Sequence, residues 1–132
     1  MRIHHLALRT QSPRELAKFY RGVLGLPELR SSRDGRQVRS IWLDAGGTIL
    51  MIERAEPGEP AIPERTMELV AFAVSQTQHR RLRARLRRRR VPLDGETAFT
   101  SYFRDPDGRR VGISHFSADA EQQKRRARRK AM

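Results

Sequence analysis

The first side chains suited to chemistry are two adjacent histidines, His4 and His5, followed by Arg9. An imidazole can act as a general base near neutral pH, bind a metal ion or simply line a cavity. Because successive side chains of a strand point to opposite faces, Arg9 shares the face of His5 and His4 points the other way. Arg9 could pair with a carboxylate or phosphate of a ligand, or lie in solvent at a strand end.

Composition and charge exclude several kinds of site. Without cysteine there are no disulfides, thiolate ligands or thiol nucleophiles. The 132-residue chain has a net charge of +13, and the excess lies in two blocks. Eight arginines lie from Arg80 to Arg90 without an acid, and six basic residues lie from Ser117 to Met132 against two acids. These blocks could bind a polyanion without reading its sequence, or could be solvated surfaces enriched in arginine by codon usage.

The length suits one folded unit or two very small modules. No stretch approaches the roughly 20 consecutive apolar residues that a membrane-spanning helix requires. The N-terminus has no apolar signal region, so we expect a cytoplasmic protein.

Residues 1–58 have the pattern of one strand, one helix and three strands. Ser12 is a candidate N-cap followed by a proline, and Gly25 lies where a left-handed residue ends a helix. A turn-rich break is expected at Ser31 to Gly35. The expected strands include Ile3 to Arg9, Val38 to Asp44 and Thr48 to Glu53.

Residues 64–117 repeat this order of elements. Since neither copy of about 60 residues closes a core alone, the two should pack together. Residues 118–132 have no apolar face, which indicates a disordered basic tail. The second copy is expected to have strands at Glu68 to Val74, Thr97 to Phe103 and Arg110 to Phe116, and a helix at Thr77 to Arg90.

Four short motifs carry a family resemblance: His5-Leu6-Ala7-Leu8, Phe19-Tyr20, Leu24-Gly25-Leu26 and Asp105-Pro106-Asp107-Gly108. With these motifs the chain resembles the vicinal oxygen chelate superfamily of glyoxalases, bleomycin resistance proteins and extradiol dioxygenases. Its N-terminal half is most similar to bacterial glyoxalase I. The resemblance implies an α+β fold in which two βαβββ modules form a curled mixed sheet around a cavity. It also implies a homodimer, in some members with the modules exchanged between chains.

The resemblance places a metal ion between four positions, one on the first and one on the last strand of each module. Here these positions hold His5, Met51, Leu69 and Gly112, so His5 is the one residue that could be a ligand. A divalent ion requires nitrogen and oxygen donors that the other three side chains lack. We therefore expect no cofactor, and a nickel, zinc, manganese or iron ion only if an alternative site exists.

Glu53 offers such an alternative, because it lies two residues beyond Met51 on the same face and could join His5 in a weak site. A third ligand would be needed. Trp42 and Tyr102 could stack on a ligand or belong to the core. The small or apolar residues Met51, Leu69 and Gly112 would give the cavity a dry floor, or fill it.

These observations favour a metal-independent binding protein for a small neutral or anionic molecule, with Arg9, Trp42, Met51, Leu69, Tyr102 and Gly112 as ligand-binding residues. The alternative is a divergent glyoxalase-like lyase or isomerase, or a dioxygenase-family enzyme. In it His5 and Glu53 would transfer protons, and Arg9 would stabilise the enolate. A second alternative is nonspecific polyanion binding through the arginine-rich segments.

Overall fold

The structure is a computed structural model that describes residues 1–132, apart from the side chain of Ala118. The first module comprises β1 (His5–Thr10), α1 (Pro13–Leu24), β2 (Glu28–Asp34), β3 (Gln37–Asp44) and β4 (Ile49–Arg54). The second comprises β5 (Leu69–Ala73), α2 (Gln76–Arg88), β6 (Leu93–Glu96), β7 (Thr100–Arg104) and β8 (Arg110–Ser114), and α3 (Ala118–Ala131) follows it. No helix of this described chain is long and apolar enough to cross a membrane.

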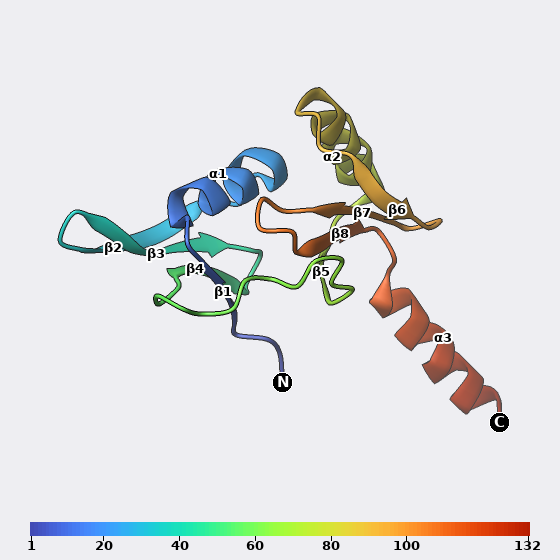
Figure 1. Ribbon diagram of the computed structural model, residues 1–132. Coiled ribbons are helices and arrows are strands. Elements are labelled where there is room, and N and C mark those ends of the chain that lie inside the picture. The colour runs from blue at the N-terminus through green and yellow to red at the C-terminus, as the bar shows by residue number, and fades with distance from the viewer.

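Each module forms a mixed four-stranded sheet with the same topology (Figure 1). The strand orders are β1-β4-β3-β2 and β5-β8-β7-β6. The first strand of each module pairs in parallel with the last, and the other neighbours pair antiparallel. The predicted α+β fold of two βαβββ modules is confirmed.

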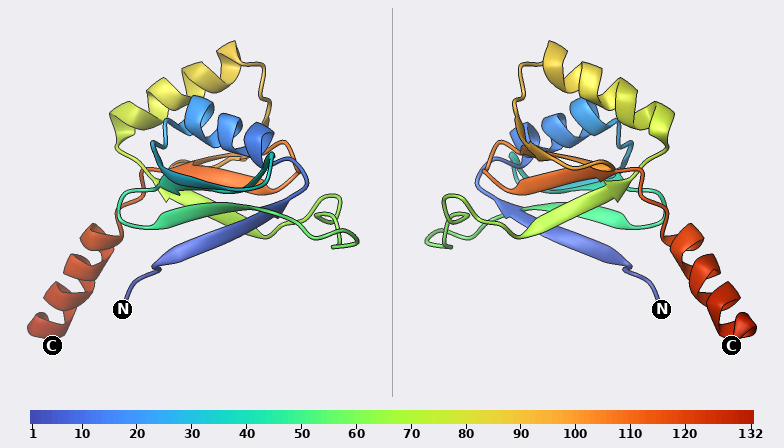
Figure 2. Two further views of the ribbon diagram at one scale, coloured as in Figure 1. Left: turned by 90° about the vertical axis from the view of Figure 1, so that its left-hand side faces the viewer. Right: turned by 90° about the vertical axis from the view of Figure 1, so that its right-hand side faces the viewer.

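The helices α1 and α2 cover the same side of the two sheets, and α3 extends from the other side (Figure 2). Helix α1 buries a wide apolar stripe that includes Leu16, Tyr20 and Val23. Helix α2 buries only His79, Leu82 and Leu86. The apolar side chains of both helices share one core cluster with Phe103 and Ile113 of the second sheet, so both modules contribute to a single core.

Two of the motif residues join the modules. The Tyr20 hydroxyl on α1 donates a 2.8 Å hydrogen bond to Oδ2 of Asp105, which starts the turn before β8. Asp105 also accepts from the backbone N–H groups of Asp107 and Arg109. Arg109 in turn pairs with Asp105 at 3.3 Å and donates to the carbonyl of Arg9. The Phe-Tyr and Asp-Pro-Asp-Gly motifs therefore stabilise the contact between the modules.

Helix α1 ends as predicted, because Gly25 has φ 72° and its N–H bonds to the carbonyl of Tyr20. The predicted break at Ser31 to Gly35 is wrong, since β2 continues to Asp34 and only then turns at Gly35. Most side chains of β2 are exposed on a sheet edge, so no apolar alternation marks the strand. Strand β6 is likewise exposed along its length, and the sequence pattern did not predict it.

Residues Ala118–Ala131 form helix α3 where the sequence indicated a disordered tail. Alanine, glutamine, lysine and arginine, which dominate this segment, are strong helix formers. Ser117 Oγ caps the helix by accepting from the N–H of Ala120 at 3.2 Å. Acids occupy the first turn and bases the last, which complements the helix dipole. The helix thus forms from local propensity, with every described side chain exposed.

Candidate functional site

The candidate site residues lie on the strand faces that the helices leave open. Strand side chains alternate between a buried helix side and an open side. On the first sheet this open face carries His5, Arg9, Trp42, Met51 and Glu53. On the second sheet it carries Leu69, Tyr102 and Gly112.

The internal repeat places an aromatic side chain beside one of the family's metal-ligand positions in each module. Met51 lies between Ala7 of β1 and Trp42 of β3. In the equivalent row of the second sheet, Gly112 lies between Ala71 and Tyr102. Both rows consist of apolar or aromatic residues. Among the described residues, the centre of each open face therefore lacks the histidine and carboxylate side chains that bind a divalent ion.

The two residues proposed for proton transfer do not meet within one chain. In the parallel pairing of β1 and β4, His5 lies opposite Ile49, and Glu53 lies opposite Arg9. Four residues of strand separate the two positions, a distance of about 13 Å. The Nδ1 atom of His5 instead lies 2.9 Å from Nδ1 of His4.

Arg9 and Glu53 neutralise one another. Their side chains form a 3.3 Å ion pair, and Arg9 also pairs with Glu59 from the connector between the modules. Hydrogen bonding to Arg9 lowers the pKa of Glu59 below its usual value, and the same contact raises the pKa of Arg9. Arg9 is therefore held by two carboxylates rather than presented to an anion.

Both aromatic candidates carry an arginine on one face. The Arg30 guanidinium lies 4.8 Å from the ring centre of Trp42, and that of Arg110 lies 3.9 Å from the ring centre of Tyr102. The indole Nε1–H of Trp42 is buried and has no hydrogen-bond partner among the described residues. A buried donor without a partner costs free energy.

Two grooves are lined by some of the predicted site residues but not by the others. A groove of about 760 Å³ on the first sheet is lined by Arg9, Trp42 and Glu53, together with Arg30 and Arg39. An apolar groove of about 890 Å³ between the modules is lined by Leu69, with Ile49 and Phe72 among its other residues. Neither groove is lined by His5, Met51, Tyr102 or Gly112.

Leu69 fills the space above Gly112. A Cβ atom added at Gly112 would lie 3.4 Å from Cδ1 of Leu69 and 3.3 Å from Cβ of Ala71. The two ligand positions of the second module therefore pack against each other. In the whole described chain, no three histidine, aspartate or glutamate side chains lie close enough to hold a metal ion. The residues present do not fit the metal that the family resemblance implies.

A polar network on the helix side of the second sheet was not foreseen from the sequence. His79 of α2 is 6% exposed, and its Nε2 lies 2.7 Å from Ser101 Oγ, which donates to Glu96 at 3.1 Å. Its Nδ1 lies 2.9 Å from Nδ1 of His115. Burial, reinforced by the charges of His115 and Arg83, lowers the pKa of His79. No local motif marks these residues, because the packing of α2 against the second sheet brings them together.

With this geometry established, comparison with known proteins places the chain in a family. Residues 2–113 match the model of the Glyoxalase/Bleomycin resistance protein/Dioxygenase superfamily. The chain therefore belongs to this superfamily, and the predicted family is confirmed. No curated protein sequence matches the chain.

Solved structures of the superfamily share the fold at low sequence identity. Lactoylglutathione lyase from Agrobacterium tumefaciens is 19% identical, with a TM-score of 0.66 over 86% of this chain and 92% of that protein. The fosfomycin resistance protein FosX from Mesorhizobium loti is 15% identical, with a TM-score of 0.75 over 92% and 96%. FosX from Listeria monocytogenes, in complex with manganese and sulfate, is 17% identical, with a TM-score of 0.73 over 90% and 94%.

Proposed function

We propose that the chain is a metal-independent binding protein for a small neutral or anionic organic molecule. The observation that carries this proposal is the replacement of three of the four family ligand positions by Met51, Leu69 and Gly112. In the structure Met51 and Gly112 lie in two rows of apolar and aromatic side chains, and Leu69 packs over Gly112. Such surfaces favour apolar and stacking contacts with an organic ligand over coordination of a cation.

The groove that contains Trp42 is the proposed binding site. Trp42 has an unpartnered buried N–H, and Arg30 lies on its ring. Arg30 and Arg39 both line the groove, and neither has a carboxylate within 4.0 Å among the described residues. A planar ligand with a carboxylate oxygen would pair with these two guanidinium groups.

A homodimer would complete the site. The open sheet faces are uncovered in one chain, and Leu69 on the second sheet is 41% exposed. A second copy that covers these faces would bury apolar side chains and enclose the groove. The dimer is tested by analytical ultracentrifugation, in which a monomer at micromolar concentration would contradict it.

The lyase or isomerase alternative requires a second copy as well. Within one chain Glu53 lies about 13 Å along the strands from His5 and is paired with Arg9. His5 would have to act with a residue of the partner. The binding proposal requires no catalytic residue from a second copy, which would only enclose the groove.

The intrinsic fluorescence of Trp42 tests the binding proposal directly, because Trp42 is the only tryptophan of the chain. We expect benzoate and substituted benzoates to change its emission in a saturable manner in the presence of EDTA. The corresponding benzamides are neutral, so comparing their affinity with that of the benzoates measures the contribution of the ligand's negative charge. An Arg30→Gln variant should bind more weakly, and Arg104→Gln, on the second sheet, serves as the matched control. An emission spectrum that none of these compounds changes would argue against binding in this groove.

A further inference from the structure

A third concave surface lies on the helix side of the first sheet and is strongly basic. This basic groove, of about 740 Å³, lies between α1, the β2–β3 hairpin and the residues that follow α2. Its charged lining residues are the cations Arg14, Lys18, Arg21, Arg33 and Arg89 and one carboxylate, Glu28. The basic groove is separate from the open sheet faces, since the helices lie on the opposite side of the sheets (Figure 2).

The cations of the basic groove are not neutralised by the protein. Among the described residues, Arg14, Lys18, Arg33 and Arg89 have no carboxylate within 4.0 Å, and Arg21 reaches Glu28 only at 3.9 Å. On the open faces Arg9, Arg104 and Arg110 each pair with an acid, whereas Arg30 and Arg39 have no such partner among the described residues. The positive charge of the basic groove is therefore available to a bound anion.

The spacing of these cations forms a continuous row. Arg14, Lys18 and Arg21 are at positions i, i+4 and i+7 of α1, so they lie on one stripe about 10 Å long. Gly22 lies beside the stripe and leaves room for Arg89, because a Cβ atom at Gly22 would lie 2.7 Å from Nη1 of Arg89. The residues after α2 thereby extend the row formed by α1.

A ligand for this surface must carry closely spaced negative charges. Double-stranded nucleic acid carries one negative charge per about 1.7 Å of its axis, and arginine and lysine bind its phosphates. No aromatic side chain is present among the described residues that line the basic groove, so the bases of a single strand would find no stacking partner there. The geometry points to binding of the phosphate backbone of double-stranded nucleic acid, without reading of the base sequence.

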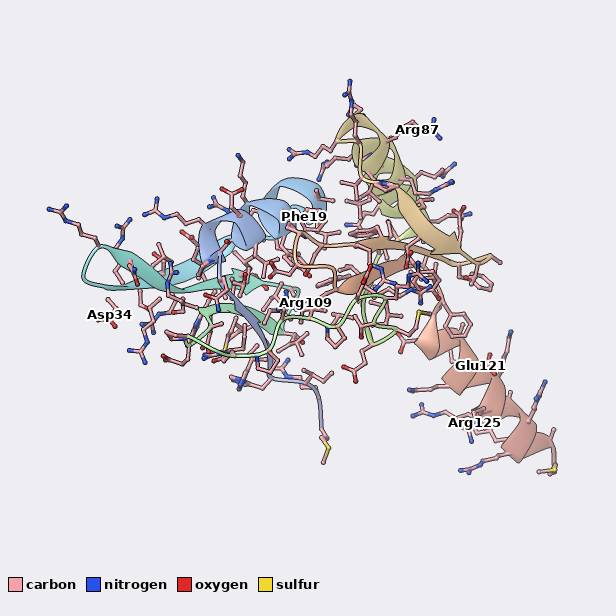
Figure 3. All side chains as sticks on the ribbon, viewed as in Figure 1. Phe19, Asp34, Arg87, Arg109, Glu121 and Arg125 are labelled. Carbon is pink, nitrogen blue, oxygen red and sulfur yellow. The ribbon has the colours of Figure 1, made fainter. Side chains whose placement is uncertain are left out.

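The basic groove and the basic helix α3 can be tested separately. Figure 3 shows Arg87 on α2 and Arg125 on α3 in different parts of the molecule. A groove variant, R14Q/K18Q/R33Q, removes three positive charges from the basic groove. A tail variant, R125Q/R126Q/R128Q, removes three from the exposed face of α3. Both variants keep the full chain and have the same net charge.

Fluorescence anisotropy with a short labelled DNA duplex, between about 50 and 200 mM salt, measures affinity and its salt dependence. Removal of one cation that binds a phosphate lowers the slope of log affinity against log salt by about 0.9, so the slope of the groove variant should be smaller by about 2 to 3. We expect the affinity of the tail variant to remain within a factor of about 2 of the wild type. Circular dichroism and thermal midpoints verify that both variants are folded.

A third variant, Gly22→Ala, tests the basic groove without changing the charge. The added methyl group displaces the Arg89 guanidinium, so DNA affinity should fall while the helix remains intact. Equal weakening by the groove and tail variants would show that net charge alone governs binding and would overturn the proposal. The proposal would also be overturned by a loss of affinity confined to the tail variant. The same holds if the wild-type protein does not bind the duplex, or if it binds tripolyphosphate but not DNA.

Discussion

The hydrogen bond between Tyr20 and Asp105 gives the most direct test of how the two modules are held together. Tyr20 is 2% exposed, and the Asp105 side chain is 0% exposed. Burial, together with the nearby carboxylate of Asp105, raises the pKa of Tyr20, so its hydroxyl remains a donor. A hydrogen bond to a charged buried group contributes about 1.5–3 kcal/mol. Tyr20→Phe should therefore lower the free energy of unfolding by about 2 kcal/mol.

Urea denaturation followed by circular dichroism measures this decrease. For a chain of this length, about 2 kcal/mol corresponds to a fall of about 6–10 °C in the thermal midpoint. Tyr102→Phe is the matched control, since Tyr102 lies on an open face and should change stability by less than about 0.5 kcal/mol. The reasoning is refuted if Tyr20→Phe is no more destabilising than Tyr102→Phe.

Three further predictions concern the helices. Since the pKa of His79 is lowered on folding, the unfolded chain takes up the proton first as pH falls below about 6.5, so stability should decrease between about pH 7.5 and 5.5. His79→Gln should flatten this profile in urea titrations, and an unchanged slope would exclude His79 as its cause. Gly22→Ala should raise the thermal midpoint through its helix propensity, worth about 0.5–1 kcal/mol, whereas a lower midpoint would mean that Arg89 cannot move aside. Helix α3 should exchange its amide hydrogens within seconds while α1 remains protected, because α3 buries no described side chain; slow exchange in α3 would indicate that another surface covers it.

The duplicated fold could be predicted from the sequence because its core elements carry clear patterns. The apolar stripe of α1, Gly25 at its end and the alternating residues of β3 and β4 all give local signals. Strands β2 and β6 give none, since an exposed edge strand can be built from polar residues. The residues of helix α3 have a high helix propensity, but the segment has no apolar face. A segment without an apolar face is also typical of a disordered tail, which is what the sequence predicts.

The strand face on which the candidate side chains lie could be predicted from the sequence, whereas their contacts could not. The alternation of strand side chains places His5, Arg9 and Glu53 on one face, as the structure has them. The register that separates His5 from Glu53 depends on which residues of β1 and β4 pair, and one strand alone does not reveal this pairing. The ion pair of Arg9 with Glu59 and the network around His79 arise from distant segments, so no spacing along the chain marks them.

Metal binding by the wild-type chain and by His5→Ala decides whether the protein binds its ligand without a metal ion. Untagged protein is analysed for its elemental content and then titrated with nickel, zinc, cobalt and manganese. If the chain is a metal-independent binding protein, both forms will contain far less than one metal ion per chain, and neither titration will saturate. Stoichiometric metal in the wild type that is absent from His5→Ala would contradict the account and show that a second copy completes a metal site around His5.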